Sequence, residues 1–337
     1  PVTFATFMEV ALVGPGGFFD EPPVGTDGDF LTAPHVHPVF TDLVRFAVGD
    51  LREALGEPEP LRLVDLGAGD GTLLAGLVEG FREIEGVAID AAGVDASAGA
   101  RRRLAARGIA AAARLDDLPP GDPAVVIANE LLDNLPFRWV RRVEDGFREM
   151  RIDDRDGAFV PVEVPCDPGL AALAGDMPIG LDAFVSPAAL DLVDALASWM
   201  RRGYALLIDY GWEDRPAREV HGYRDHRLVA DVLAEPGSRD ITAGVDLGAL
   251  ARRARERGLA VLGSTTQGEA LRSLGYDAWQ AQQRERQGSM AAAGEHLTAL
   301  RAWEGRGLAS VLVDPERLGG FRWLLLATPG LPAPAWI

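Results

Sequence analysis

The strongest fold signal in the chain is the run Val64-Asp65-Leu66-Gly67-Ala68-Gly69-Asp70-Gly71-Thr72. An apolar stretch breaks there into three alternating glycines, and a helical pattern begins at Thr72. Glycine allows a sharp turn and a close approach of backbone to ligand, and the first turn of a helix has free N–H groups. Close helix-to-sheet packing is the alternative use of such a turn. In this context the run predicts a strand, a ligand-binding turn and a helix, and it implies a nucleotide-like cofactor.

Dinucleotides are one class of cofactor that binds at a glycine-rich turn of this kind. Dinucleotide-binding folds favour the spacing G-x-G-x-x-G, with pyrophosphate on the end of the helix. The spacing here is G-x-G-x-G, and the acidic residue Asp65 precedes it. A second carboxylate, Asp95, ends the next expected strand and could accept hydrogen bonds from both ribose hydroxyls of a dinucleotide or of another nucleotide-like cofactor. The glycine spacing therefore argues against a nicotinamide-dependent oxidoreductase.

Strand and helix patterns alternate along most of the chain. Apolar runs predict strands at 61–66, 91–95, 109–113, 124–128, 204–209, 259–263 and 321–327, and helical patterns cover 39–51, 72–83, 98–106, 187–200, 247–257 and 277–305. This order is typical of an α/β fold with a mostly parallel sheet covered on both faces. Between 139 and 164 the pattern changes to alternation with two Asp-Gly turns, which predicts an antiparallel insertion.

The composition argues against several classes of function. The 337 residues carry a formal net charge of −18, which disfavours nucleic acid and anionic membranes as partners. There is no lysine, so a Schiff-base lysine and a Walker A loop are excluded. The single cysteine, Cys166, indicates a reducing compartment. No apolar run reaches the roughly 20 residues of a membrane span, and the amino end shows no basic-then-apolar signal, so we expect a cytoplasmic protein.

Polar side chains follow the third and fourth expected strands. Asp116 and Asp117 follow the third, where a carboxylate often meets an adenine amino group and where a solvated turn is an equal alternative. Asn129 and Glu130 follow the fourth, with Asp133 shortly after them. This edge of an open α/β sheet faces the binding crevice. Helix capping could explain one of the last three residues but hardly all of them.

Several blocks, in the same order, resemble the MidA-like methyltransferases, a family that includes a mitochondrial arginine methyltransferase needed for respiratory complex I assembly. The loop at 67–71 is similar to motif I of enzymes that use S-adenosylmethionine. The other similar blocks lie at 28–34, 129–136, 207–211, 236–242 and 266–269. Together the blocks extend over nearly the whole chain, which makes a chance resemblance improbable.

The resemblance implies a Rossmann-like class I methyltransferase of seven strands with S-adenosylmethionine as its cofactor. Carried over to this chain, it places at the cofactor Phe30, Thr32, Pro34, Asp65, Gly67, Ala68, Gly69, Gly71, Asp95, Ala96, Asp116, Asp117, Asn129 and Glu130. It also implies that residues 1–60 cap the cofactor site of a core at 61–337. Insertions near 137–186, 213–245 and 267–318 would elaborate that core, and paired apolar insertions would suit a homodimer.

Two departures from the family pattern lie where the methyl acceptor would enter. The stretch at 35–42 lacks the usual acidic residue and Phe-Gly-Glu, and Gly17-Phe18-Phe19 replaces Gly-Tyr-Tyr. The acceptor therefore stays open between a protein arginine and a small-molecule nucleophile. An assembly factor without turnover is a further alternative, but the glycines and Asn129-Glu130 are retained. His35 and His37 lack further metal ligands nearby, so no metal is expected.

Methyl transfer requires an acceptor aligned with the methyl group in a site without water. A guanidinium acceptor stays charged and pairs with carboxylates, so Glu130 is the first catalytic candidate, followed by Asp133 and Asp209. Asp209 could equally well be present because its carboxylate caps the end of the strand at 204–209. Tyr210 could orient the acceptor, and His226 could act as a general base, although structural roles are commoner for both.

Overall fold

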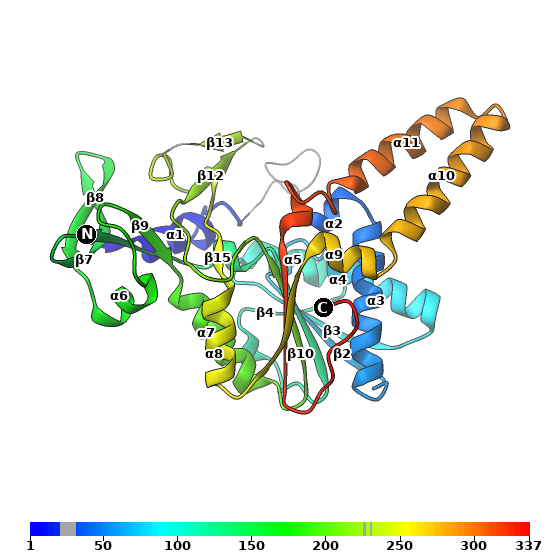
Figure 1. Cartoon of the computed structure of the whole chain (residues 1–337), viewed down its shortest axis with the longest axis horizontal. Helices are drawn as coiled ribbons and strands as arrows, with labels where there is room; N and C mark the ends of the chain where they lie inside the picture. Colours follow the sequence, from blue (N-terminus) through cyan, green and yellow to red (C-terminus); the bar gives the residue numbers. More distant parts are fainter. Residues whose placement is uncertain (21–31, 225–226, 230) are drawn as a thin grey trace.

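A seven-stranded sheet forms the centre of the molecule, for which a computed structural model describes residues 1–20, 32–224, 227–229 and 231–337 (Figure 1). Its strands, in spatial order, are β16 (Ala260–Thr266), β17 (Arg322–Ala327), β10 (Gly203–Asp209), β5 (Ala124–Asn129), β2 (Leu61–Leu66), β3 (Ile89–Val94) and β4 (Ala110–Ala112). Within this sheet β17 runs antiparallel to both neighbours, and the strands from β10 to β4 are parallel. The predicted mostly parallel α/β fold is confirmed.

Helices cover both faces of this sheet. One face carries α3 (Val39–Ala54), α4 (Thr72–Gly80) with its π-helical extension η1 (Phe81–Glu85), and α9 (Gln267–Ser273); the other carries α7 (Pro187–Trp199) and α8 (Leu247–Glu256). The successive residues Val125 and Val126 of β5 are fully buried and belong to the two opposite apolar clusters. Burial on both faces explains why these strands are continuous apolar runs.

The amino end of the chain joins a second, antiparallel sheet. This sheet contains β1 (Val2–Thr3), β6 (Arg138–Val143), β7 (Gly146–Arg155), β8 (Ala158–Pro165) and β9 (Asp182–Val185), and α6 (Pro168–Ala174) lies beside it. α1 (Phe4–Val13) packs against β6 and β7, and the ring of Phe4 contacts Trp139 and Phe184 edge-on. The expected antiparallel hairpins are therefore present, and the first residues complete their core.

The remaining elements are shorter helices, small sheets and turns that connect or flank those already described. They are α2 (Ala33–Val36), α5 (Ala98–Ala106), β11 (Gly211–Trp212) paired with β15 (Val245–Asp246), the small sheet of β12 (His221–Arg224), β13 (Arg227–Val229) and β14 (Asp240–Thr242), and the short 3₁₀ turns η2 (Leu115–Asp117), η3 (Leu132–Asn134) and η4 (Leu318–Gly320). The helical pattern at 277–305 is a hairpin of two helices, α10 (Tyr276–Ala292) and α11 (His296–Ser310), which projects from the rest (Figure 1). Gly294, with φ 84°, lies at the break between them.

The helix expected to help cap the cofactor has another position. Residues of α3 such as Phe40 and Leu43 are buried in the main core, and no residue of α3 lines the cavity described below. The strongly apolar face of this helix explains its place on the sheet. The division into a capping segment and a core with insertions stays a prediction. Among the described residues, no helix combines the length and the apolar character that crossing a bilayer requires.

Candidate active site

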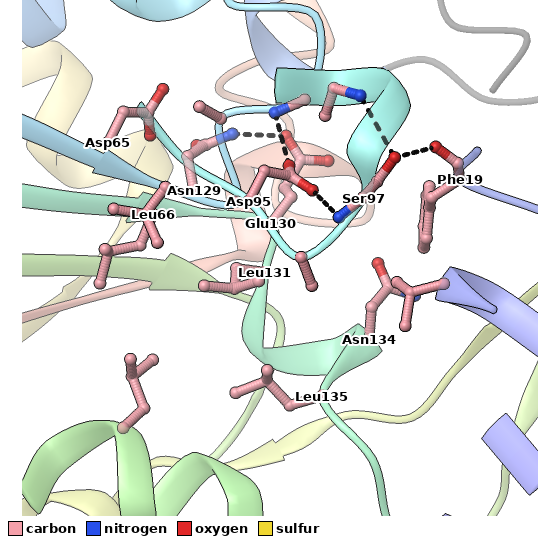
Figure 2. A pocket seen from close by; sticks show the side chains of 18 of the residues that line it. Phe19, Asp65, Leu66, Asp95, Ser97, Asn129, Glu130, Leu131, Asn134 and Leu135 are labelled. Atoms are coloured by element: carbon pink, nitrogen blue, oxygen red, sulfur yellow. Dashed lines mark hydrogen bonds between the residues drawn. The ribbon is translucent and has the colours of Figure 1, made fainter. Parts of the chain in front are cut away.

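A cavity of about 530 Å³ lies at the carboxyl ends of β2, β3 and β5 (Figure 2). Its wall combines the loop after β2, the residues that follow the neighbouring strands, part of α7 and residues of the amino-terminal segment. The predicted cofactor residues that line it are Thr32, Pro34, Asp65, Gly67, Ala68, Gly69, Asp95, Ala96, Asp116, Asn129 and Glu130. Gly71 and Asp117 are not part of the wall, and Phe30 lies outside the described residues.

The glycine loop needs glycine for different reasons at different positions. Gly67 and Gly69 line the cavity with φ of 72° and 55°, a region that favours glycine. A Cβ on Gly67 would also lie 2.9 Å from Cδ1 of Leu131. Gly71 has φ 77°, and a Cβ there would lie 2.8 Å from Cδ2 of Leu104. Gly71 therefore permits close packing of α5, whereas the first two glycines shape the ligand site.

Only one of the two adjacent aspartates after β4 lies at the cavity. Asp116 belongs to the wall, whereas Oδ2 of Asp117 accepts a hydrogen bond of 3.0 Å from the backbone N–H of Arg114. Asp117 thus stabilises the turn η2. The sequence could not separate the two residues because both follow the same short strand.

Asp95 and Asp65 place two carboxyl groups in the wall. Asp95 accepts from the backbone N–H groups of Gly69 (2.9 Å) and Ser97 (2.8 Å), one on each oxygen, and burial raises its pKa (Figure 2). Asp65 is 4% exposed, and burial raises its pKa to about 8, with smaller contributions from the charges of Asp95 and Asp70. Each oxygen of Asp95 keeps acceptor capacity for a ligand hydroxyl.

Glu130 and Asn129 lie at the end of β5 and line the cavity. Oε1 of Glu130 accepts from the backbone N–H of Ala33 (2.7 Å) and from Nδ2 of Asn129 (3.0 Å). Glu130 has φ 54°, which is rare for a residue other than glycine. Burial raises its pKa to about 7. Oδ1 of Asn129 is buried and has no hydrogen-bond partner among the described residues.

Asp209 stabilises the loop behind these residues. It is fully buried, does not line the cavity, and accepts hydrogen bonds from the backbone N–H groups of Leu132 (2.8 Å), Asp133 (3.1 Å) and Tyr210 (2.8 Å). Burial and the neighbouring charge of Asp133 raise the pKa of Asp209. The capping alternative thus describes its geometry, and a direct contact with substrate does not follow from it.

The acidic group next to Glu130 includes a residue that sequence reasoning did not select. Oγ1 of Thr242 donates to Oδ2 of Asp133 (2.5 Å) and is 2.9 Å from the hydroxyl of Tyr210. Oδ1 of Asp133 is buried without a partner among the described residues. Asp240, 7% exposed, accepts from Nδ2 of Asn134 (2.7 Å). The block 236–242 carried the signal for Asp240 and Thr242. His226 lies outside the described residues.

The amino-terminal segment contributes three contacts to the cavity wall. Oγ of Ser97 donates to the carbonyl of Phe19 (2.7 Å), the backbone N–H of Ala33 donates to Glu130 (2.7 Å), and Nε2 of His35 is 3.3 Å from Oδ2 of Asp70. These contacts join the loops after β3, β5 and β2. The wall therefore depends on residues that precede the first strand of the central sheet.

The two histidines of this segment have separate partners. Burial opposes ionisation of Asp70, but hydrogen bonds from His35 and Thr72 outweigh it and lower its pKa. The ring of His37 packs against Trp279, and its Nδ1 accepts from the backbone N–H of Val39 (3.1 Å). Within the described ranges, no group of three or more His, Cys, Asp or Glu side chains could hold a metal ion.

We expect the free protein to lose stability as the pH rises from about 4 to about 8. Burial raises the pKa of Asp65 and Asp240 to about 8 and that of Glu130 to about 7. Carboxyl groups of the unfolded chain ionise at about pH 4. Across this window the folded state therefore binds more protons than the unfolded state, and the free energy of unfolding falls as the pH rises. Thermal unfolding followed from about pH 5 to about pH 9 measures how stability depends on pH.

The variant Asp65→Asn should show a smaller decrease of the melting temperature with pH, whereas Asp176→Asn, at an exposed position, should keep the native dependence. Each pKa unit of difference between the two states corresponds to about 1.4 kcal/mol. A melting temperature that stays constant or rises over the same range in the native protein would contradict the raised pKa values.

Comparisons with known proteins agree with this geometry. A model of a family of S-adenosyl-L-methionine-dependent methyltransferases matches residues 48–265, more than half of the chain. Protein arginine methyltransferase NDUFAF7, mitochondrial, from Xenopus tropicalis is 27% identical over 317 residues, which cover 82% of this chain and 73% of the relative. The human relative of the same name is 25% identical over 322 residues, covering 82% and 70% of the two chains.

A solved structure extends the similarity to the architecture. A superfamily member from Burkholderia thailandensis, bound to S-adenosyl-homocysteine and described as a methyl transferase, is 28% identical to this chain. The alignment has a TM-score of 0.82 and covers 97% of this chain and 87% of the other. The similarity therefore includes the central sheet, the second sheet and most of the loops around the cavity.

The prediction of a cytoplasmic location was wrong, because the curated relatives are named as mitochondrial proteins. Two of the observations on which it rested do not exclude mitochondria. A single cysteine indicates only a reducing compartment. The signal sought at the amino end was the one that directs secretion.

Proposed function

The chain belongs to the MidA-like family of S-adenosyl-L-methionine-dependent methyltransferases, and from this premise we propose that it methylates the guanidinium of a protein arginine. The cofactor supplies a methyl group on a positively charged sulfur. The protein must then bind the cofactor, align the acceptor and exclude water. The residues of the cavity fit these tasks as follows.

The wall offers partners suited to each part of the cofactor. Gly67 and Gly69 would allow its amino-acid end to approach the backbone. The carboxylate of Asp95 would accept from the ribose hydroxyls, and Asp116 would face the adenine amino group. In this arrangement, hydrogen-bond acceptors of the protein would face hydrogen-bond donors of the cofactor.

The charge of the wall favours a cationic acceptor. The acidic residues that line it are Glu9, Asp65, Asp70, Asp95, Asp116, Glu130 and Asp191, whereas its arginines are Arg103 and Arg114. An excess of carboxylates in a partly desolvated cavity attracts cations and repels anions. A guanidinium keeps its charge at every physiological pH, so it matches this wall better than a neutral hydroxyl does.

The single observation that carries the proposal is the carboxylate of Glu130. The backbone N–H of Ala33 and the amide of Asn129 both donate to Oε1, which fixes the side chain and leaves Oε2 without a hydrogen bond from a described residue. A fixed carboxylate with one free oxygen suits an N–H of a guanidinium. Asp133 does not line the cavity, so it would act on the acceptor site only through its charge, which also helps to raise the pKa of Glu130. The names of the curated relatives support the same acceptor.

The experiment that tests the proposal is transfer of a labelled methyl group from the cofactor to the protein fraction and to the small-molecule fraction of one lysate. We expect label in methylarginine after hydrolysis of the protein fraction. Label in a small molecule, or in another amino acid, would overturn the arginine acceptor. Absence of label from both fractions would favour the alternative of an assembly factor. Because the sequence contains no lysine, any methyl-lysine found would not arise from methylation of this chain itself.

A further inference from the structure

The helix α11 presents its large apolar side chains to solvent. Four of them, which we call the α11 face, are between 51% and 76% exposed: Leu297, Leu300, Trp303 and Leu308. The three leucines lie on one side of the helix, because their spacings of three, eight and eleven residues are close to whole turns. The buried residues of this helix are small ones, Ala299 and Ala309. A contiguous group of exposed apolar side chains indicates a surface that another molecule covers.

The hairpin of α10 and α11 differs in charge from the chain as a whole. The chain has a net charge of −18, whereas residues 276–310 are neutral, with four acidic and four arginine side chains. These are Asp277, Glu285, Glu295, Glu304, Arg284, Arg286, Arg301 and Arg306. Two copies of a strongly anionic protein repel each other over most of their surfaces. A neutral hairpin that projects from the rest therefore offers them a contact at low electrostatic cost (Figure 1). Its balance also disfavours an anionic membrane, which attracts basic segments.

The α11 face is also complementary to itself. If two copies of this helix pack antiparallel about a two-fold axis between positions 302 and 303, residues at equal distances from the axis face each other. Leu297 of one copy then lies opposite Leu308 of the other, and Arg301 lies opposite Glu304. Both charged side chains are exposed, and they share the side of the leucines because each follows one of them by four residues. The dimer contains each of these contacts twice.

We propose that the α11 face forms the interface of a homodimer in which two α11 helices pack antiparallel. The leucines of the two copies bury one another, and Arg301 of each copy pairs with Glu304 of the other. Opposite charges placed in this way fix the choice of partner and its orientation. None of the residues that the structure places around the cofactor cavity belongs to α10 or α11, so the dimer leaves that site open. One pair of helices is a small interface, so we expect a dissociation constant on the order of 10 μM.

Sedimentation velocity from about 1 to about 200 μM protein tests the proposal, because this range includes the expected dissociation constant. The native protein should change from monomer to dimer. Arg301→Glu and Glu304→Arg each place like charges opposite each other, so each variant alone should dimerise at least about tenfold more weakly. An equimolar mixture of the two variants restores opposite charges at both positions. The mixture should form a heterodimer with nearly native affinity.

Arg255→Glu is the matched control, because it makes the same change of charge at an exposed position of α8. It should dimerise like the native protein. A native protein that stays monomeric at the highest concentration would overturn the proposal and leave the α11 face to a different protein or to a membrane. Native dimerisation of both single variants would place the interface elsewhere and overturn it as well, and so would failure of their mixture to associate. Native affinity of each variant for S-adenosylhomocysteine verifies that the fold is intact.

Discussion

Replacing Gly67 with valine should weaken cofactor binding by at least about a hundredfold while the protein stays folded. Gly67 has φ 72°, which costs other residues about 1–2 kcal/mol, and a β-branched residue more. A Cβ there would also lie 2.9 Å from Cδ1 of Leu131, in the wall of the cavity. Relief of either strain must move the loop that approaches the cofactor. Calorimetric titration with S-adenosylmethionine measures the loss.

Gly86→Val is a matched control for this experiment. Gly86 has a similar φ of 69°, open space around its Cβ position and no part in the cavity wall. Both variants therefore carry backbone strain, and only Gly67→Val should lose the cofactor. Equal affinities of the two variants would show that the loop does not hold the cofactor.

The variant Glu130→Gln should reduce kcat by about 10²- to 10³-fold and leave cofactor affinity within about threefold of the native value. The glutamine oxygen can still accept from the backbone N–H of Ala33, so the loop keeps its position. The negative charge next to the acceptor is lost. Because burial raises the pKa of Glu130 to about 7, native activity should rise with pH through this value as the carboxyl ionises.

The control for the second experiment is Asp191→Asn, which removes an exposed acidic group of α7 from the same cavity wall. Asp191→Asn should retain most of the activity and the native pH profile, whereas Glu130→Gln should lose the rise in activity at about pH 7. Native kcat in the Glu130 variant, with arginine as the labelled residue, would remove Glu130 from the mechanism.

The fold was largely predictable because its signals are local. Each strand of the central sheet is an apolar run of its own, and the glycine loop marks its first turn. The position of β17 between β10 and β16 could not be predicted in this way, since strand order depends on contacts between distant segments. The break at Gly294 was missed because a single glycine is compatible with a continuous helix.

The candidate site was predictable where residues directly follow a strand, and less so elsewhere. Spacing alone could not tell that Gly71 packs against α5 or that Asp209 binds backbone N–H groups, because both facts depend on tertiary contacts. The partner of Asp133, Thr242, comes from a small sheet more than one hundred residues later in the chain.

The acidic wall of the cavity also bears on what happens after the reaction. Loss of the methyl group turns the sulfonium of the cofactor into a neutral thioether. Ionised carboxylates such as Asp70, whose pKa is lowered, attract the first form more strongly than the second, and salt reduces this difference. The product should therefore leave more readily than the fresh cofactor, so product inhibition should be weak at low ionic strength. Accumulated S-adenosylhomocysteine would slow this enzyme less than one with an uncharged pocket.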